Sequence, residues 1–187
     1  MRWDELFADM EAQLAAAGQQ ALEAEAAEQA RAEYSRVLLA DRLRACHGEP
    51  VRALLADGAP VAGRVASLGA GWVQLAERDV EHLVPLGAPV WWELPGRRWA
   101  PGGDVLALRL GLGHALRTLA RARARVRVRL AGAGPSGVLD GTLDAVGADF
   151  ADLALHPGED WRRRGSVRAV RSLPFAALAC VSSAPGD

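Results

Sequence analysis

The sequence contains no lysine, because arginine supplies all 22 of its basic side chains. These arginines face 23 acidic residues, so the formal net charge is −1 and the chain as a whole has no strong attraction to nucleic acid or to an anionic membrane. A composition also rich in alanine and glycine is typical of GC-rich coding sequence. Arginine enrichment is therefore weak evidence for phosphate binding in this chain.

Long apolar runs and cysteines are also scarce. No apolar run approaches the ~20 residues that a membrane-spanning helix needs, and the acidic residues that closely follow Met1 are unlike a secretory leader. The only two cysteines, Cys46 and Cys180, lie far apart and lack metal-ligand spacing. These observations favour a cytoplasmic protein with two reduced thiols and no membrane partner.

A recognisable catalytic or metal-binding set is absent from the sequence. No histidine has another histidine, a cysteine or an acid at metal-ligand spacing, and no serine stands in a nucleophile elbow. Asp149 and Asp152 are close in sequence but are expected to point to opposite faces of one strand. We therefore expect a non-enzymatic protein with no catalytic residues, no cofactor and no bound metal.

The sequence does contain a pattern that occurs twice. Residues 63–75 align without a gap with residues 141–153. The matching pairs are Gly63 with Gly141, Gly69 with Gly147, Ala70 with Ala148, Trp72 with Phe150, and Leu75 with Leu153. Pro85 matches Pro174 once an extra stretch in the second copy is allowed for. Glycines, prolines and aromatic residues constrain the backbone, so the pattern predicts two copies of one fold.

Each copy is expected to form five short strands. The predicted strands of the first copy are 51–55, 61–68, 71–76, 81–84 and 90–93. Those of the second copy are 126–130, 137–146, 150–156, 166–171 and 177–182. Five strands this short cannot form a broad sandwich, and a glycine inside a strand permits a sharp bend. Each copy is therefore predicted to be a small, strongly bent β-barrel.

Helices are expected before each set of strands. Residues 3 to about 46 are predicted to be helical, with Gly18 as the point of interruption, and residues 106–122 form a second predicted helix. The first helix carries an apolar stripe of four side chains: Trp3, Phe7, Met10 and Leu14. Such a stripe must be covered by the protein's own barrels, by a second copy or by a partner's groove.

The predicted segments are an N-terminal helical segment (1–48), a first barrel (49–95), a linker and helix (96–124), a second barrel (125–183) and a tail (184–187). An alternating apolar strand, then Asp57 and Gly58, then a strand containing Gly63, resembles the Sm-like small barrel. The match is better over 51–75 than over 126–153, and residues 83–86 are more similar to the closing strand of PRC-barrel domains. The resemblance implies an α+β fold with two tandem five-stranded small β-barrels of the SH3/Sm-like class joined by a helix.

The resemblance does not extend to the usual RNA pocket. Sm-like proteins that bind uridine-rich RNA place an Asp and an Asn after the internal glycine and an Arg-Gly pair near the end. Here the corresponding turns are 69–71 and 147–149, and Val73 and Ala151 stand near the Asn position. The chain therefore resembles the family in its fold and differs from it in the residues that bind RNA.

A run of alternating arginines is the strongest candidate for nucleic-acid binding. Its members are Arg121, Arg123, Arg125, Arg127 and Arg129. If one strand covers the run, all five guanidinium groups project from one face, where they could bind phosphates. The other interpretations are a solvated strand face and a docking surface for the acidic N-terminal helix, whose segment 1–48 has five arginines against nine acids.

Tryptophans are the candidate interface residues. Trp91 and Trp92 are adjacent in a predicted strand and must face opposite ways, so one is expected to be exposed beside Trp99 and the nearby arginines. The alternative is that this tryptophan packs on the helix between the barrels. Trp161 precedes three arginines in the second copy, where it would stack on a base or lie in a solvated turn.

These features together predict a binding or scaffolding protein that acts through protein–protein contacts of its helix and barrel faces. The expected partner is another protein or a second copy of this chain, as a homodimer or through pairing of barrel edges between chains. RNA bound by the arginine run is the alternative partner.

Overall fold

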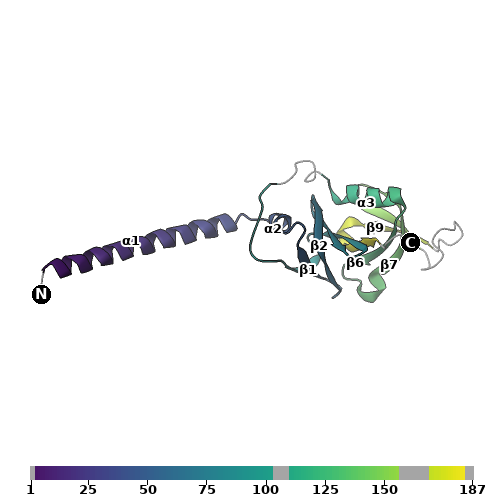
Figure 1. Ribbon diagram of the computed structural model, residues 1–187. Coiled ribbons are helices and arrows are strands. Elements are labelled where there is room, and N and C mark those ends of the chain that lie inside the picture. Colours follow the sequence, from purple (N-terminus) through teal and green to yellow (C-terminus); the bar gives the residue numbers. More distant parts are fainter. Residues whose placement is uncertain (1–2, 103–109, 156–168, 184–187) are drawn as a thin grey trace. The chain divides into compact units, whose positions relative to one another are not determined.

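The computed structural model of the chain describes residues 3–102, 110–155 and 169–183. The chain divides into two compact units, Met1–Leu38 and Leu39–Asp187. The described part of the first unit is a single long helix, α1 (Trp3–Tyr34), followed by a turn (Figure 1). The predicted interruption at Gly18 is wrong, because α1 runs through it and ends at Tyr34. The strong helix formers on both sides of Gly18 outweigh its cost of about 1 kcal/mol.

The second unit contains the sheet and two further helices. The helices are α2 (Leu39–Ala45) and α3 (Leu112–Ala122), with short 3-10 turns at Gly134–Gly137 and Phe175–Ala177. The strands of the first copy are β1 (Pro50–Leu55), β2 (Pro60–Gly69), β3 (Trp72–Glu77), β4 (Val80–Pro85) and β5 (Pro89–Glu93). Those of the second copy are β6 (Arg125–Leu130), β7 (Val138–Val146), β8 (Phe150–Leu155), β9 (Ala169–Pro174) and β10 (Leu178–Ser183). None of the described helices is both long enough and apolar enough to cross a membrane.

All ten described strands belong to one antiparallel sheet. Their order is β5-β1-β2-β3-β4-β10-β6-β7-β8-β9, so the mixed α+β fold class is confirmed. The two tandem closed barrels are not seen, because the sheet is open and continuous. In each copy the fifth strand pairs with the first, as β5–β1 and β10–β6. The outer edge of β10 then pairs with β4 of the other copy, which joins the two halves.

The two copies repeat the same register as well as the same order. Gly63 lies opposite Val51 in the first copy, and Gly141 lies opposite Val126 in the second. The pairing of the second and third strands shifts register two residues after each of these glycines, in both copies. The pairing of the first and fifth strands is also irregular at the same place in both copies. Bulges are specific features of a strand pair, so their repetition strengthens the evidence for duplication.

The glycines inside the second strands are required by close packing of the backbone. A Cβ at Gly63 would lie 2.9 Å from the carbonyl oxygen of Ala76. A Cβ at Gly141 would lie even closer to the carbonyl oxygen of Ala154. Each glycine therefore allows an approach of the third strand that no other residue permits, which is how a short strand bends sharply.

The sheet has a hydrophobic core on each side. We call the pairing of β4 with β10 the seam, and these two strands contribute to both cores. The first core contains Val84 of β4 and Cys180 of β10. The second core contains the neighbouring residues Leu83 and Val181. Because successive residues of a strand point to opposite faces, β4 and β10 pack into the cores of both copies at once. The helix α3 covers the second core with the fully buried Leu116.

Candidate functional site at the seam between the two halves

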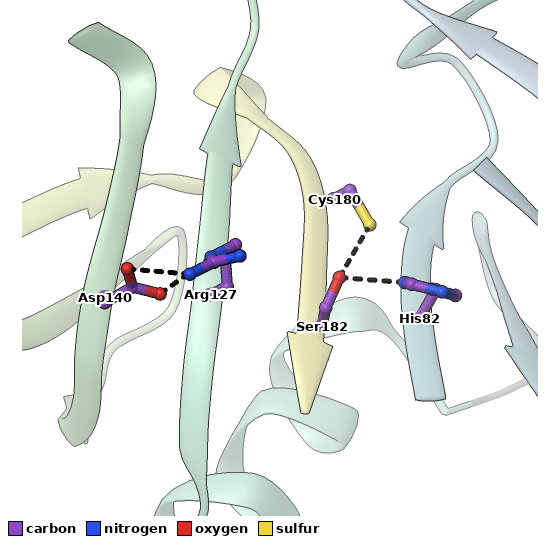
Figure 2. Close-up of polar contacts among 5 residues, drawn as sticks. All are labelled: His82, Arg127, Asp140, Cys180 and Ser182. Atoms are coloured by element: carbon purple, nitrogen blue, oxygen red, sulfur yellow. Dashed lines mark hydrogen bonds and ion pairs between the residues drawn. The ribbon is translucent and has the colours of Figure 1, made fainter. Parts of the chain in front are cut away.

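A row of polar side chains crosses the seam on four neighbouring strands (Figure 2). Asp140 of β7 lies opposite Arg127 of β6, which lies opposite Ser182 of β10, which in turn lies opposite His82 of β4. Residues that lie opposite each other in a sheet share a face, so these four side chains lie side by side. We call them the polar row.

Hydrogen bonds connect the polar row in two pairs (Figure 2). The Arg127 guanidinium donates to both carboxylate oxygens of Asp140, at 2.9 and 3.2 Å. This hydrogen bond, helped by the charge of Asp140, raises the pKa of Arg127. The Ser182 hydroxyl lies 2.8 Å from His82 Nδ1 and 3.6 Å from the sulfur of Cys180. The second pair therefore joins the two copies directly across the seam.

The arrangement around His82 has the order of a nucleophile, a base and an orienting acid. His82 Nε2 lies 3.5 Å from the carboxylate of Glu77, while Ser182 lies on its other nitrogen. Two features disfavour catalysis. The distance of 3.5 Å is long for a hydrogen bond. In addition, β10 is paired on both sides, so its backbone N–H groups serve the sheet and are not free to stabilise an oxyanion. The geometry favours a structural link between the copies.

A second polar link joins the copies beside the polar row. Arg129 of β6 donates from Nη1 to the Asp57 carboxylate at 3.0 Å, and the Asp57 side chain is only 4% exposed. The other carboxylate oxygen of Asp57 accepts the backbone N–H of Ala59, at 2.9 Å, within its own turn. Asp57 therefore holds a turn of the first copy and an arginine of the second copy together.

The buried thiol of Cys180 lies close to this link. Burial raises its pKa to about 11, against smaller lowering effects of the hydrogen bond with Ser182 and of the charge of Arg129. The pKa of Cys46 is also raised, first by burial and then by the nearby charge of Glu49. Both cysteines are free and buried, so neither is placed to act as a nucleophile at neutral pH.

A groove of about 430 Å³ lies over the seam. Its lining includes His82, Arg125, Arg127, Arg129, Asp140 and Ser182. Arg127 and Arg129 each have a carboxylate partner, whereas no ion pair of Arg125 is found within the described ranges. The groove therefore presents less uncompensated positive charge than its three arginines suggest.

The condition for a single face of five arginines, one strand over the whole run, is not met. Only Arg125, Arg127 and Arg129 lie on β6, where they alternate with the buried Val126 and Val128. Arg121 belongs to the last turn of α3. Arg123 ends that helix in the left-handed conformation, with φ 48°, and its N–H bonds the helix carbonyls. The end of α3 at Ala122 agrees with the predicted helix 106–122, and β6 begins within one residue of the predicted strand 126–130.

The apolar stripe of α1 is exposed on its helix. Trp3, Phe7, Met10 and Leu14 have exposed fractions between 51% and 73%. Their spacing of four, three and four residues continues along α1 with small side chains at the next three positions: Ala17, Ala21 and Ala24. Seven positions therefore follow the heptad spacing of a coiled coil. The first four were predicted from the sequence, whereas the alanines were not, because they carry no obvious apolar pattern.

The tryptophans of β5 face opposite ways, as strand alternation predicts. Trp92 is partly buried and packs against the first core, with its indole nitrogen 3.4 Å from the carbonyl oxygen of Leu86. Trp91 is 43% exposed on the other face, and Trp99 is similarly exposed in the segment that follows β5. Trp161 lies outside the described residues.

The residues that join the copies were not identified from the sequence. His82 and Ser182 are 100 residues apart, and Asp57 and Arg129 are 72 apart. No local motif marks them.

The described part of the chain contains no group of three or more histidine, cysteine or acidic side chains that could hold a metal ion. No protein-family model matches the chain, and no curated protein matches its sequence.

Proposed function

We propose that this chain is a non-enzymatic binding or scaffolding protein that acts through protein–protein contacts of α1 and of its sheet surfaces. The observation that carries the proposal is the exposed apolar stripe of α1. Exposed apolar area costs about 25 cal/mol per Å², so covering Trp3, Phe7, Met10 and Leu14 with another apolar surface is favourable. Contiguous apolar patches of this kind mark interaction sites.

A second helix is the covering element that the stripe fits best. The heptad spacing gives α1 a narrow apolar stripe, with large side chains in its first half and alanines in its second half. The sequence of α1 has eight acidic residues and one arginine. A partner helix with basic residues beside its apolar seam would therefore gain attraction, whereas a second copy of α1 would have to tolerate like charges.

Paired charge substitutions in α1 test the proposal. The stripe variant carries Phe7→Glu and Leu14→Glu. The matched control carries Ala12→Glu and Gln19→Glu, which add the same charge at the same seven-residue spacing on another face of α1. The stripe variant is expected to lose its partner in affinity capture, or its self-association in sedimentation velocity, while the control keeps both. Wild-type behaviour of the stripe variant in both measurements contradicts the proposal.

RNA binding by the arginines of β6 is the alternative function. Its support is the groove lined by Arg125, Arg127 and Arg129. The pairing of Arg127 with Asp140 and of Arg129 with Asp57 weakens it, because these guanidinium groups are already neutralised. Phosphate binding falls steeply with salt, so nucleic-acid-free protein is assayed for RNA binding over a salt series. Replacement of Arg125 and Arg127 by glutamine should weaken binding to all sequences, and salt-independent behaviour removes this alternative.

The proposal also concerns the fold of each half of the sheet and the cellular compartment of the protein. We interpret each half of the sheet as a small barrel-like unit of the Sm-like kind, on the support of the repeated strand order, bulges and internal glycines. We also place the protein in the cytoplasm, where two free, buried thiols are in their ordinary state.

A further inference from the structure

The apolar stripe of α1 has a large half and a small half. Its first four heptad positions hold Trp3, Phe7, Met10 and Leu14, and alanines hold the next three. All seven positions are exposed in the single chain. A second helix that covers the whole stripe must therefore be small where α1 is large and large where α1 is small.

A second copy of α1 meets this requirement when it runs in the opposite direction. The spacing of four and three residues makes alternate stripe positions a and d, and in an antiparallel pair each a packs beside a d of the other helix. The pairs in one such register are Trp3 with Ala21, Phe7 with Ala17, and Met10 with Leu14. The outer pairs each join an aromatic residue to an alanine, and the central pair joins two side chains of similar volume. The two stripes therefore fill each other.

A parallel pair of the same helices lacks this complementarity. Each residue would then face its own copy, so Trp3 would meet Trp3 and Ala21 would meet Ala21. The distance between packed helices ranges from about 8 to 10 Å, depending on the side chains at the contact. A parallel pair would be held apart at its aromatic end and would leave empty space between its alanines.

The antiparallel register also keeps most of the acidic residues of α1 apart. The paired stretch ends at Ala21, so the acidic residues from Glu23 onward lie beyond it. Beside the stripe, Glu11 lies near its own copy, and one like-charge contact of this kind weakens association by about twofold. The next possible antiparallel register would place Glu28 opposite Trp3, which exchanges an apolar contact for a buried carboxylate. The register with Phe7 opposite Ala17 is therefore the better one.

We propose that α1 of one chain pairs antiparallel with α1 of a second copy, with Phe7 opposite Ala17. The inference rests on the function proposed for α1 and names the occupant of its stripe. The two helices end at opposite ends of the pair, where the two Tyr34 residues lie about 65 Å apart at a rise of 1.5 Å per residue. Each end continues into one sheet unit, so the dimer presents every sheet surface twice.

Changes of side-chain size test this pairing in the full chain. Ala17→Leu is expected to weaken self-association on the order of tenfold in sedimentation velocity, because the added side chain meets Phe7 of the second copy. Phe7→Ala should weaken it as well, because it leaves a cavity. The chain with both substitutions should recover, since each contact again joins a large side chain to a small one. Ala12→Leu, on another face of α1, is the matched control and should leave self-association unchanged.

These variants keep the helix intact. Leucine and alanine are both strong helix formers, and circular dichroism checks that α1 stays helical. The stripe variant, with Phe7→Glu and Leu14→Glu, supplies the baseline without pairing of α1. Association through any other surface is therefore measured separately.

Cysteine substitutions at the same two positions test the direction of the helices. Phe7→Cys and Ala17→Cys are placed in separate full chains, and oxidation is followed by non-reducing electrophoresis. A mixture of the two variants should form a disulfide-linked dimer. Neither variant alone should do so, because equal positions are about 15 Å apart in this register and a disulfide needs Cα atoms within about 7 Å. The native cysteines are buried, so the wild-type chain should stay unlinked.

Several outcomes would overturn the inference. A full chain that stays monomeric up to its solubility limit rejects it, and affinity capture with the stripe variant then decides separately on the function proposed for α1. Stronger association of Ala17→Leu, or cross-linking of either cysteine variant with itself, would show a parallel pair. A double variant that fails to recover would reject this register. Self-association that the stripe variant retains in full would reject this inference and, if captured partners are retained as well, the function proposed for α1.

Discussion

At the scale of single residues, two aspartates with similar arginine partners differ in their surroundings. Asp57 is nearly buried, accepts a turn N–H and holds Arg129, whereas the Asp140 side chain is 34% exposed beside an exposed Arg127. Removing a partner from a buried charge-assisted bond leaves the other group unsatisfied. The same removal at the surface costs little, because water replaces the partner.

Asp57→Ala is therefore expected to lower the free energy of unfolding by about 1–3 kcal/mol. Asp140→Ala, the matched control, should lower it by less than about 1 kcal/mol. Urea unfolding followed by circular dichroism measures both. Equal effects of the two substitutions would contradict the structural importance given to the link between Asp57 and Arg129.

The raised pKa of Cys180 predicts a loss of stability in alkali. Its folded-state pKa of about 11 lies above the ordinary thiol value of 9.0. Between these values the folded state binds more protons than the unfolded state. The contribution of the protonated Cys180 thiol to the free energy of unfolding is therefore fully present below pH 9 and is lost as the pH rises towards 11. The chain has no lysine, so few other groups titrate in this range.

Urea unfolding at a series of pH values across this window measures the loss. A Cys180→Ala variant is expected to show a smaller decline from its own starting stability. The same decline in both proteins would show that another group is responsible.

Residue-level prediction from the sequence succeeded where local geometry decides. The repeat identified Gly63 and Gly141, and strand alternation required Trp91 and Trp92 to face opposite ways, as they do. The polar row could not be predicted from the sequence, because His82 and Ser182 meet only through the pairing of β4 with β10. Neither residue stands in a local motif, and hydrogen bonds across 100 residues leave no periodic pattern.

At the scale of elements, the bend of β7 depends on the glycine at its centre. A Cβ at Gly141 would collide with the backbone of Ala154 in β8, and backbone cannot move aside as a flexible side chain does. Gly141→Ala is expected to lower the free energy of unfolding by about 1–3 kcal/mol. Thermal unfolding followed by circular dichroism measures the change.

Gly87→Ala is the matched control, because a Cβ there meets nothing within 4 Å and its backbone angle is ordinary. It should leave stability unchanged or raise it slightly by restricting the unfolded chain. A Gly141→Ala variant as stable as this control would mean that β7 and β8 can separate without cost.

Most elements were predictable within one to three residues, since strand propensity and turn residues mark them locally. The main error concerns the first helix. Gly18 did not break α1, because the residues around it are strong helix formers. The end of α3 at Ala122 agrees with the predicted helix 106–122, and β6 begins at Arg125, one residue before the predicted strand 126–130.

At the scale of the whole molecule, the shared seam predicts that both halves of the sheet unfold together. Val65 is fully buried in the first core and Leu153 in the second, and β4 and β10 contribute to both cores. Val65→Ala and Leu153→Ala should therefore each lower the midpoint of the same single transition, with a cost of about 2–5 kcal/mol for the leucine. Differential scanning calorimetry and hydrogen exchange of amides in both halves provide the measurement.

Two transitions for the sheet, each sensitive to only one of the substitutions, would show that the halves are independent. The sequence led to the expectation of separate barrels because each copy is locally complete. Pairing of β4 with β10 is a long-range event that local patterns do not encode.

The central position of β10 also affects how the molecule can be made. Translation produces this strand after the other nine, yet it lies between β4 and β6 and fills part of the first core with Ala179 and Cys180. Until β10 has emerged, the other nine described strands form two separate sheets, in which the edges of β4 and β6 are unpaired. Such edges are open to wrong pairing. Completion of the described sheet therefore waits for β10, and a chain that lacks β10 is expected to be more open to wrong pairing.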